Sequence, residues 1–311
     1  MIGNIEEKII IKHIVEHVTK QNLWDKDQFG FMRKRNTTTA AIKLIQKIAA
    51  STKKEKHSGV AILSLDVRKA FDSLSHNMIM RKILKRYNIA GSVANFIHDF
   101  LINRHMVVRV GGEHSETKDC SSGCPQGCCS SPPLYSMGIG DFVLSDPGDV
   151  NEEMFKVMFA DYATIIKALE NAFDEDRMNR NLKVVYEYMA ENHLHLHGKK
   201  FRIMMVAPGS HTPQDFKILN NYGKRIPFQG KITFLGMTLD KNLTFNQHIE
   251  MQISKAKRLT HLAARTFVTR KASTWRTLGL SIILSTLEYQ ILACGRLYGY
   301  SYEKNESVQI F

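Results

Sequence analysis

The sequence predicts an α+β fold in which helices cover an antiparallel sheet. Two short apolar runs, 60–65 and 153–160, have the length and composition of buried central strands. Segments with helical periodicity lie around these runs, and glycine-containing turns separate shorter strands. At 311 residues and 43% hydrophobic content, the chain is long enough to bury a large core. We therefore expect two domains, or one larger unit divided into subdomains.

The N-terminal half predicts helices on both sides of the first strand. They are expected at 5–20, 37–50, 74–87 and 92–102. A loop with the sequence QFGF, residues 28–31, joins the first two helices, and the charged stretch 51–59 predicts a solvent-exposed loop. After the last of these helices, Gly111 and Gly112 predict the turn of a hairpin.

A second hairpin, 154–168, is expected to carry Asp161 at its bend. An amphipathic helix follows at 173–192, and strands near 194–206 and 231–239 are expected to close the same sheet. The sheet would then be assembled from segments far apart in the chain.

Basic residues outnumber acidic ones, which favours a polyanionic partner. Lys and Arg total 43 against 30 Asp and Glu, a net charge of +13. From about residue 245 helical periodicity returns, with basic stretches at 255–258 and 265–271 and an apolar helix at 273–293. A basic protein with no nucleic-acid role is the alternative that charge alone leaves open.

Asp66 and Asp161 each follow an apolar run, so the sheet is expected to bring them together. Two Mg²⁺ ions about 3.5–4 Å apart and held by carboxylates activate a 3′-hydroxyl and stabilise departing pyrophosphate in nucleotidyl transfer. The backbone carbonyl of Val67 adds a further oxygen, the ligand that Mg²⁺ prefers. Taken singly, each aspartate also suits a turn or a helix cap.

The segment GCPQGCCSSPPL, residues 123–134, lies between the two aspartates and predicts a turn followed by a helix. Ser is a favourable N-cap, and Pro is tolerated in a first turn. Cysteines stand at 120, 124, 128, 129 and 294. Their spacing differs from the two-residue knuckle of structural zinc sites, so we predict small buried side chains in a reduced protein and no zinc, with zinc binding as the alternative.

Five segments resemble motifs A to E of reverse transcriptases in order and approximate spacing. They are LDVRKAFD, GCPQGCCSSPPL, FAD, LHLHGKKFRIMMV and TFLGMTLDKNLTFNQHI. With QFGFMRKRNTTTAAI ahead of them, the set resembles the retrotransposon type without long terminal repeats, the LINE and jockey-like elements. The resemblance covers roughly residues 5–265.

This resemblance implies a right-hand polymerase fold, with 1–59 as part of the fingers, 60–240 as the palm and 241–311 as a thumb-like helical region. It implies an RNA-directed DNA polymerase that uses two Mg²⁺ ions, or Mn²⁺ in their place, to join dNTPs to a DNA primer on an RNA template. The chain is expected to be a fragment of a longer element protein that carries a nuclease domain.

The first two motifs imply contacts with the incoming nucleotide. Arg68 and Lys69 would face the triphosphate, or solvent. Phe71 would close the space beside the sugar 2′-carbon and so select deoxynucleotides, although a core aromatic is the alternative. Gln126 and Gly127 would contact the template and the incoming base, where a glycine permits close approach of the backbone. An RNA-dependent RNA polymerase is disfavoured because Phe71 would crowd a ribose hydroxyl.

The last two motifs imply a general acid and a primer grip. Lys200 matches the lysine that would neutralise the leaving pyrophosphate and donate a proton to it, with Lys199 as the competing assignment. The four residues that resemble the primer grip are Phe234, Leu235, Gly236 and Met237, which otherwise suit an ordinary buried strand.

One residue departs from the family pattern. The third motif of the family has two adjacent aspartates, whereas Asp161 is followed by Tyr162. A phenol with a reference pKa of about 10 is neutral at pH 7 and a poor Mg²⁺ ligand. Losing one electrostatic stabiliser typically costs on the order of 10²–10³ in rate. A catalytically inactive nucleic-acid-binding remnant is therefore the competing functional class.

Two further patterns bear on ligands and setting. His193, His195 and His197 alternate, so on a strand their side chains would share one face. We expect a surface strand whose sequence has drifted from the family pattern, and a metal site is the alternative. No apolar run reaches the roughly 18 residues needed to span a bilayer, and the N-terminus lacks a signal pattern. We expect a nuclear or cytoplasmic protein with no membrane partner.

Overall fold

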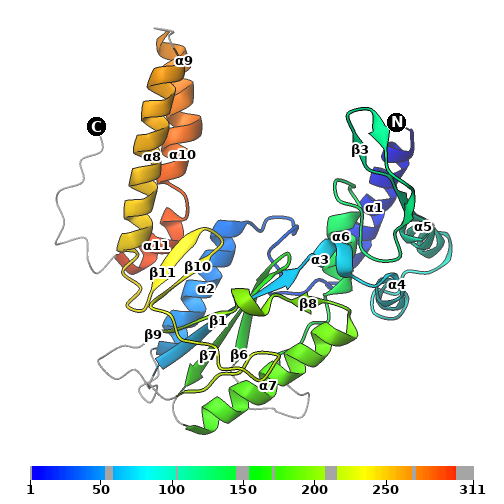
Figure 1. The fold of residues 1–311 in the computed structure, drawn as a ribbon, viewed down its shortest axis with the longest axis horizontal. Helices are drawn as coiled ribbons and strands as arrows, with labels where there is room; N and C mark the ends of the chain where they lie inside the picture. Colours follow the sequence, from blue (N-terminus) through cyan, green and yellow to red (C-terminus); the bar gives the residue numbers. More distant parts are fainter. Residues whose placement is uncertain are drawn as a thin grey trace.

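The computed structural model describes residues 2–52, 59–102, 104–144, 154–169, 172–206, 216–267 and 271–298. At its centre is a five-stranded antiparallel sheet of order β6-β7-β1-β8, with β9 also paired with β1 (Figure 1). The strands are β1 Gly59–Arg68, β6 Met154–Phe159, β7 Tyr162–Leu169, β8 His195–Leu196 and β9 Arg202–Val206. The run 60–65 lies in the central strand β1 as predicted, whereas the run 153–160 forms the edge strand β6, which β7 separates from β1.

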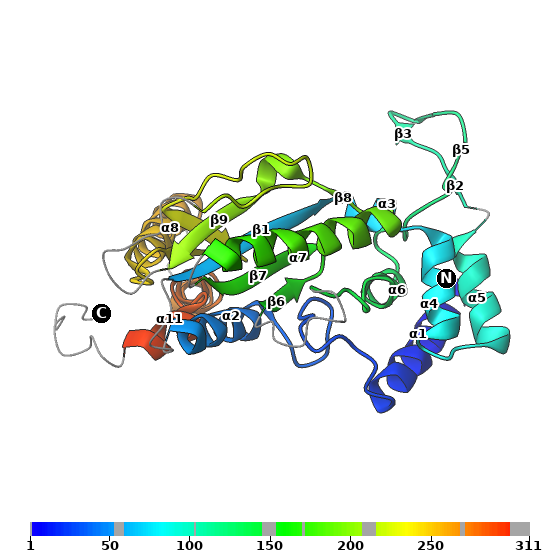
Figure 2. The ribbon, with the colours of Figure 1, turned by 90° about the horizontal axis from the view of Figure 1, so that it is seen from below.

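Helices account for most of the remaining described residues. They are α1 Ile2–Lys20, α2 Thr37–Thr52, α3 Ala70–Ser73, α4 His76–Lys85, α5 Gly91–Leu101, α6 Ser131–Gly138, α7 Ala172–Glu191, α8 Asn246–Thr266, α9 Ala272–Leu278, α10 Ser285–Leu287 and α11 Ile291–Tyr298. Helix α7 lies across one face of the sheet (Figure 2). Helix α2 packs on the other face.

Alternation along β1 explains why the sheet is covered on both faces. Val60 and Ile62 belong to one core cluster together with Leu44 of α2. Leu63 belongs to a second cluster together with Leu182 of α7. Because successive side chains of a strand point to opposite faces, a strand buried on both faces must be apolar at every position. This is why the run 60–65 identified β1 in the sequence.

Two hairpins stand outside the central sheet. The predicted turn at Gly111 and Gly112 is confirmed, with both glycines at positive φ. It closes a hairpin that projects from the body (Figure 2), built from β2 His105–Met106, β3 Arg109–Val110, β4 Glu113–His114 and β5 Lys118–Asp119. The strands expected at 231–239 do not close the central sheet. They form a separate two-stranded sheet, β10 Lys231–Phe234 with β11 Met237–Asp240.

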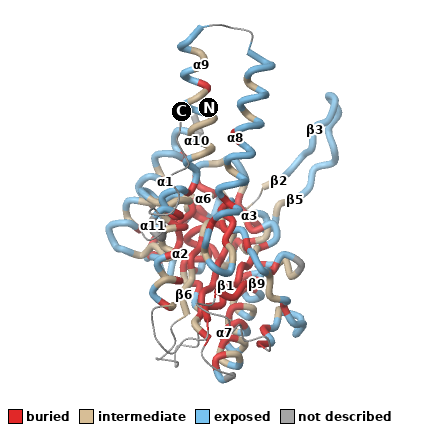
Figure 3. Tube along the Cα trace, turned by 90° about the vertical axis from the view of Figure 1, so that its left-hand side faces the viewer, coloured by how far each residue is buried: buried red, intermediate tan, exposed pale blue. Residues whose placement is uncertain are grey.

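The C-terminal elements form a helical pair that rises from the body and is largely exposed (Figure 3). Its first member is α8, and its second runs through α9, a π-helical stretch Gly279–Leu284 and α10. The continuous helix expected at 273–293 is wrong, because Gln290 takes a left-handed conformation at φ 63° and ends it before α11. Of the predicted charged loop 51–59, residues 53–58 lie outside the described residues.

A buried lysine joins three segments around α4. The Lys82 ammonium, 4% exposed, donates to the Asp141 carboxylate at 2.6 Å, the Asn192 side-chain oxygen at 2.7 Å and the Tyr188 hydroxyl at 3.1 Å. Burial lowers the pKa of Lys82. Although burial opposes it, hydrogen bonds from Lys82 and Tyr188 hold the pKa of Asp141 below its ordinary value. The ion pair and the two further hydrogen bonds of Lys82 therefore hold together three segments: α4, the end of α6, and α7.

Candidate active site

The end of β1 and the turn between β6 and β7 bring Asp66 and Asp161 together. Asp66 lies opposite Tyr162 in the antiparallel register, and the Val67 N–H donates to the Asp161 carbonyl at 3.4 Å. Burial first, and then the charge of Asp66, raise the pKa of Asp161. The two carboxylates are thus within electrostatic reach of each other. No third His, Cys, Asp or Glu in the described segments joins them to form a group of three.

A divalent cation fits this carboxylate pair. Burial first, and the charge of Asp66 after it, disfavour the charged form of Asp161, and a cation beside the two carboxylates would stabilise that form. Lys200 supplies one positive charge at this place, because its ammonium lies 2.9 Å from the Asp66 carboxylate. The His197 N–H, just ahead of the short 3₁₀ helix that carries Lys200, donates to the Asp66 carbonyl at 2.9 Å.

Gln28, in the loop before α2, holds the turn that carries Asp161. Its side-chain oxygen accepts from the N–H groups of Gly30 at 2.8 Å and Ala160 at 3.0 Å, and its amide donates to the Ala160 carbonyl at 3.3 Å. Ala160 has a left-handed φ of 54°, and a Cβ on Gly30 would lie 2.3 Å from its nitrogen. Sequence reasoning missed this role of Gln28, since an amide that pairs with a distant turn leaves no local pattern.

We expect Gln28→Ala to lower the free energy of unfolding by about 1–3 kcal/mol, because the buried N–H groups of Gly30 and Ala160 lose their acceptor. Gln28→Glu keeps the acceptor but buries a carboxylate whose second oxygen faces the Ala160 carbonyl, so it should not restore stability. Chemical denaturation measures both, with exposed Gln21→Ala as the matched control. A Gln28→Ala protein as stable as the Gln21→Ala protein would show that the amide does not support the turn.

The segment predicted to turn at 123–130 is docked on α3. The Cys124 N–H donates to the Phe71 carbonyl at 2.7 Å. The Gln126 amide donates to the Asp72 carboxylate at 3.1 Å, so Asp72 lies inside α3 and serves as an acceptor. Gly127 has a φ of 92°, a conformation that favours glycine, and open space lies where a Cβ would be. Gln126 and Gly127 are thereby held close to Phe71.

Phe71 belongs to an aromatic cluster beside the carboxylates. Its ring stacks on Tyr135 at a centroid distance of 4.5 Å and meets Phe31 edge-on at 5.7 Å. Burial first, and then the charge of Asp161, raise the pKa of Tyr135, which places this cluster near the carboxylate pair. Phe71 itself is half-buried, so part of its ring packs in this cluster and part is accessible to solvent.

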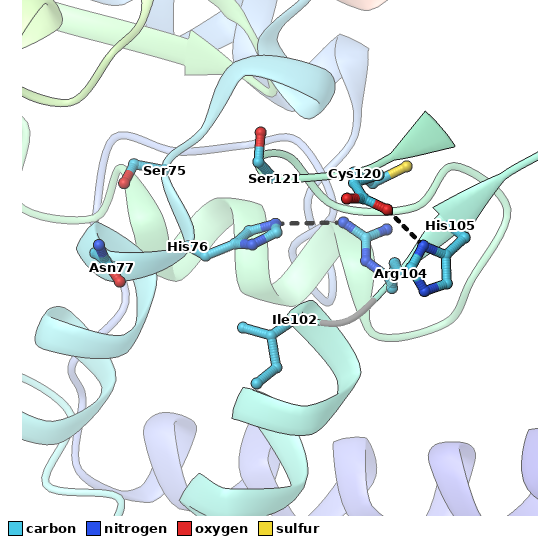
Figure 4. A pocket seen from close by; sticks show the side chains of 9 residues that line it. Ser75, His76, Asn77, Ile102, Arg104, His105, Cys120 and Ser121 are labelled. Carbon is cyan, nitrogen blue, oxygen red and sulfur yellow. Dashed lines mark hydrogen bonds and ion pairs between the residues drawn. The ribbon is translucent and has the colours of Figure 1, made fainter. Parts of the chain in front are cut away.

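Two side chains hold the carbonyl of Gly123. The imidazole Nε2 of His76 lies 2.8 Å from it, and the Arg104 guanidinium donates to it at 2.7 Å. These side chains line a cavity at the base of the projecting hairpin (Figure 4). Burial lowers the pKa of His76. Neither Asp66 nor Asp161 lines the cavity, so it supports the turn from outside the candidate site.

Helix α6, which follows the turn, is capped by another helix. The Ser130 N–H donates to the carboxylate of Glu7 in α1 at 2.8 Å, and Glu7 is 8% exposed. The sequence predicted a serine cap, but the Ser130 hydroxyl makes no such bond. A buried carboxylate at a helix N-terminus satisfies an N–H and complements the helix dipole.

The remaining site residues predicted from the sequence fall at two other places. Arg68 and Lys69 are exposed at the end of β1, where Lys69 has a left-handed φ of 49°. The segment predicted as the primer grip forms the turn of β10–β11, with Leu235 at φ 45° and Gly236 at φ 80°, the signs of a type I′ hairpin. Phe234 and Met237, which flank this turn, are fully buried, so the turn alone is accessible.

The Tyr162 side chain points to β10, a direction that does not suit a metal ligand. Its hydroxyl donates to the Thr233 carbonyl at 2.8 Å and shares a hydrogen bond with the Ser64 hydroxyl at 2.7 Å. Its ring lies 5.9 Å from that of Phe234. Burial is the main cause that raises the pKa of Tyr162, so the hydroxyl keeps its proton.

The cysteine and histidine patterns have a structural outcome. All five cysteines are free; Cys124 and Cys294 are buried as expected, whereas Cys129 is exposed. Burial raises the pKa of the Cys124 thiol to about 12. The strand expected to align three histidines is short, because β8 spans only His195–Leu196 and His193 is left-handed at φ 57°.

The model of the family described as "Reverse transcriptase (RNA-dependent DNA polymerase)" matches residues 2–239. The chain belongs to this family. The RNA-directed DNA polymerase from mobile element jockey of Drosophila melanogaster is 24% identical to this reverse transcriptase chain over 251 residues, which are 80% of the chain and 27% of the jockey protein. The predicted relationship to jockey-like elements is confirmed, and the chain spans about a quarter of that relative's length.

One further relative and one solved structure are similar to this chain. A Pol polyprotein of the type-1 retrotransposable element R2 from Popillia japonica is 33% identical over 142 residues, 43% of this chain and 20% of that protein. The structure of telomerase from Candida albicans, solved with a fragment of telomeric RNA, matches with a TM-score of 0.56 at 9% identity, over 97% of this chain and 48% of that one. This likeness confirms the right-hand polymerase fold. Among the described helices, none is long and apolar enough to cross a membrane.

Proposed function

We propose that this reverse transcriptase chain joins dNTPs to the 3′-hydroxyl of a DNA primer on an RNA template. The observation that carries the proposal is the convergence of Asp66 at the end of β1 with Asp161 in the turn between β6 and β7. Mg²⁺, or Mn²⁺ in its place, would be held by these two carboxylates and the Val67 carbonyl. When bound as a pair, such ions activate the attacking hydroxyl and stabilise the leaving pyrophosphate.

Lys200 is the general acid in this proposal. Its ammonium lies 2.9 Å from the Asp66 carboxylate and is about half exposed, so it reaches both the site and an incoming triphosphate. A proton held on its Nζ neutralises charge that develops on the pyrophosphate oxygen. The Lys199 side chain lies outside the described residues, and its competing assignment stays open.

The turn and the aromatic cluster would form the dNTP site. Phe71, stacked on Tyr135, would press against the sugar at the 2′-carbon and exclude a hydroxyl there. Gly127 presents bare backbone in open space, and Gln126 stands beside it. Arg68 and Lys69 are exposed at the end of β1, where they would meet the triphosphate.

We assign residues 1–59 to the fingers, 60–240 to the palm and 241–311 to a thumb-like region. In the last of these, Lys255, Lys257, Arg258 and Arg265 are exposed on α8. Basic side chains on a protruding helix suit the phosphates of a primer-template duplex. The turn Leu235–Gly236, at the foot of this region, would contact the primer terminus.

The inactive binding remnant is the second candidate, and the loss of the adjacent aspartate at Tyr162 is the observation in its favour. The membership in a polymerase family and the retained pair Asp66 and Asp161 favour the enzyme. Retention of Lys200 beside Asp66 favours it as well.

A primer-extension assay on poly(rA) with an oligo(dT) primer tests the proposal. We expect Mg²⁺-dependent incorporation of dTTP that Asp66→Asn abolishes. Primer-template affinity should fall steeply with salt, because the basic side chains displace counterions from phosphates. Steep salt-dependent binding without extension in folded protein would favour the remnant. A slope of log K against log [salt] near zero would contradict both candidates.

A further inference from the structure

We propose that the hydroxyls of Tyr162 and Tyr289 hold the β10–β11 hairpin between the central sheet and the C-terminal helical pair, and that Tyr162 is thereby a positioning residue for the primer terminus. The part that concerns the primer rests on the proposed function. The part that concerns the hairpin is measurable without catalysis.

The hairpin needs such an attachment because it forms a sheet of its own. In the described part of the chain, β10 pairs with β11 and joins the central sheet through no strand ladder. Thr233 lies opposite Thr238, one pair away from the pair that closes the turn. In an antiparallel hairpin every second pair points its N–H and C=O groups outward. The Thr233 carbonyl therefore faces out from the edge of the hairpin and can accept from a donor outside it.

Tyr162 supplies that donor from the central sheet. Its hydroxyl lies 2.8 Å from the Thr233 carbonyl and 2.7 Å from the Ser64 hydroxyl of β1. Ser64 and Asp66 are two positions apart, so both side chains lie on the face of β1 that Tyr162 shares. The residue directly after Asp161 thus ties the hairpin to the strand that carries Asp66.

Tyr289 supplies a second donor from the helical pair. Its hydroxyl donates to the Leu235 carbonyl at 2.7 Å, inside the turn itself. Its ring fills the space beside Gly236, where a Cβ would lie 3.2 Å from it. The carbonyl of Tyr289 lies 3.2 Å from the Nε2 of His248 on α8, a side chain that is 1% exposed. The helical pair therefore holds Tyr289 while Tyr289 holds the turn.

The two bonds fix the accessible turn with respect to the carboxylates. Phe234 and Met237 anchor the hairpin in the core. Apolar packing is not directional, so it does not fix the position of the turn relative to the carboxylates. The hydrogen bonds to the carbonyls of Thr233 and Leu235, on either side of Phe234, do fix that position. A tyrosine at position 162 thus gives the hairpin a fixed position at a place where the family has an aspartate.

Single Tyr→Phe variants test the proposal, since each removes one hydroxyl and keeps the ring. Tyr162→Phe and Tyr289→Phe should each speed amide hydrogen exchange in residues 231–240 by about 3- to 10-fold, the effect of losing one hydrogen bond. Tyr186→Phe is the matched control, because its hydroxyl donates to the Leu219 carbonyl at 2.9 Å, away from the hairpin. Exchange at 231–240 that matches this control in both variants would overturn the proposal.

Kinetics then separate positioning from stability alone. In Tyr162→Phe we expect the KM for primer-template to rise by about 3- to 10-fold, with kcat and the KM for dTTP within about twofold. Faster exchange with an unchanged primer KM would overturn the positioning of the primer. If the unmodified chain extends no primer, the proposed function fails, whereas the exchange result still decides whether the tyrosines hold the hairpin.

Discussion

Tyr162→Asp is expected to increase Mg²⁺-dependent dTTP incorporation by at least on the order of 10²-fold, because it restores a charge beside the proposed metal site. Residue 162 lies opposite Asp66 in the register, so a carboxylate there would lie beside Asp66 on the same face of the sheet. The steady-state kcat on poly(rA) with an oligo(dT) primer measures the effect.

The same substitution removes the hydroxyl that binds Thr233, so the KM for primer should rise severalfold while kcat increases. Tyr162→Asn is the matched control, because it has the shape of aspartate without the charge. If Asn and Asp variants gain equally, charge is not the missing element. If the unmodified chain already equals the Asp variant, Tyr162 does not limit catalysis.

Lys82→Ala should lower the free energy of unfolding by about 3 kcal/mol, the lower end of the range of about 3–5 kcal/mol for breaking a buried ion pair. The lower end is expected because the Asp141 side chain is 34% exposed and water partly replaces the lost partner. Tyr188 and Asn192 lose a hydrogen bond as well. Urea denaturation followed by circular dichroism provides the measurement.

Lys85→Ala, at an exposed position of the same helix, is the control for the change in helix propensity and net charge. It should change stability by less than about 0.5 kcal/mol. A Lys82→Ala protein as stable as the Lys85→Ala control would contradict this prediction. It would show that the network stabilises the fold no more than water does when it solvates the separated groups.

The central sheet was predictable because its signal is local. Strand β1 is apolar at each of its first seven positions except Ser64, and the pair Asp66 and Asp161 marks where two strands end. The position of β10–β11 was not predictable in the same way. Ile232 and Phe234 alternate with exposed residues, a pattern that indicates one buried face without indicating the sheet to which the strand belongs.

The supports of the site were also beyond sequence reasoning. Gln28 pairs with Ala160, and Glu7 caps α6, each across more than a hundred positions. A buried polar side chain has the same appearance in a sequence whether its partner is near or distant. The two tyrosine hydroxyls at β10–β11 belong to this class, since a core aromatic is the default expectation for either residue.

These long-range supports have a consequence for how the molecule folds. The N-terminal segment supplies Glu7 to α6, Gln28 to the turn of Asp161 and the helix α2 that covers one face of the sheet. Without it, the face of β1 that carries Val60 and Ile62 would lose part of its apolar cover. We therefore expect the proposed division at residue 59 to separate two roles and not two independently folding units, so that a fragment that starts at β1 loses the geometry around Asp161 together with its stability.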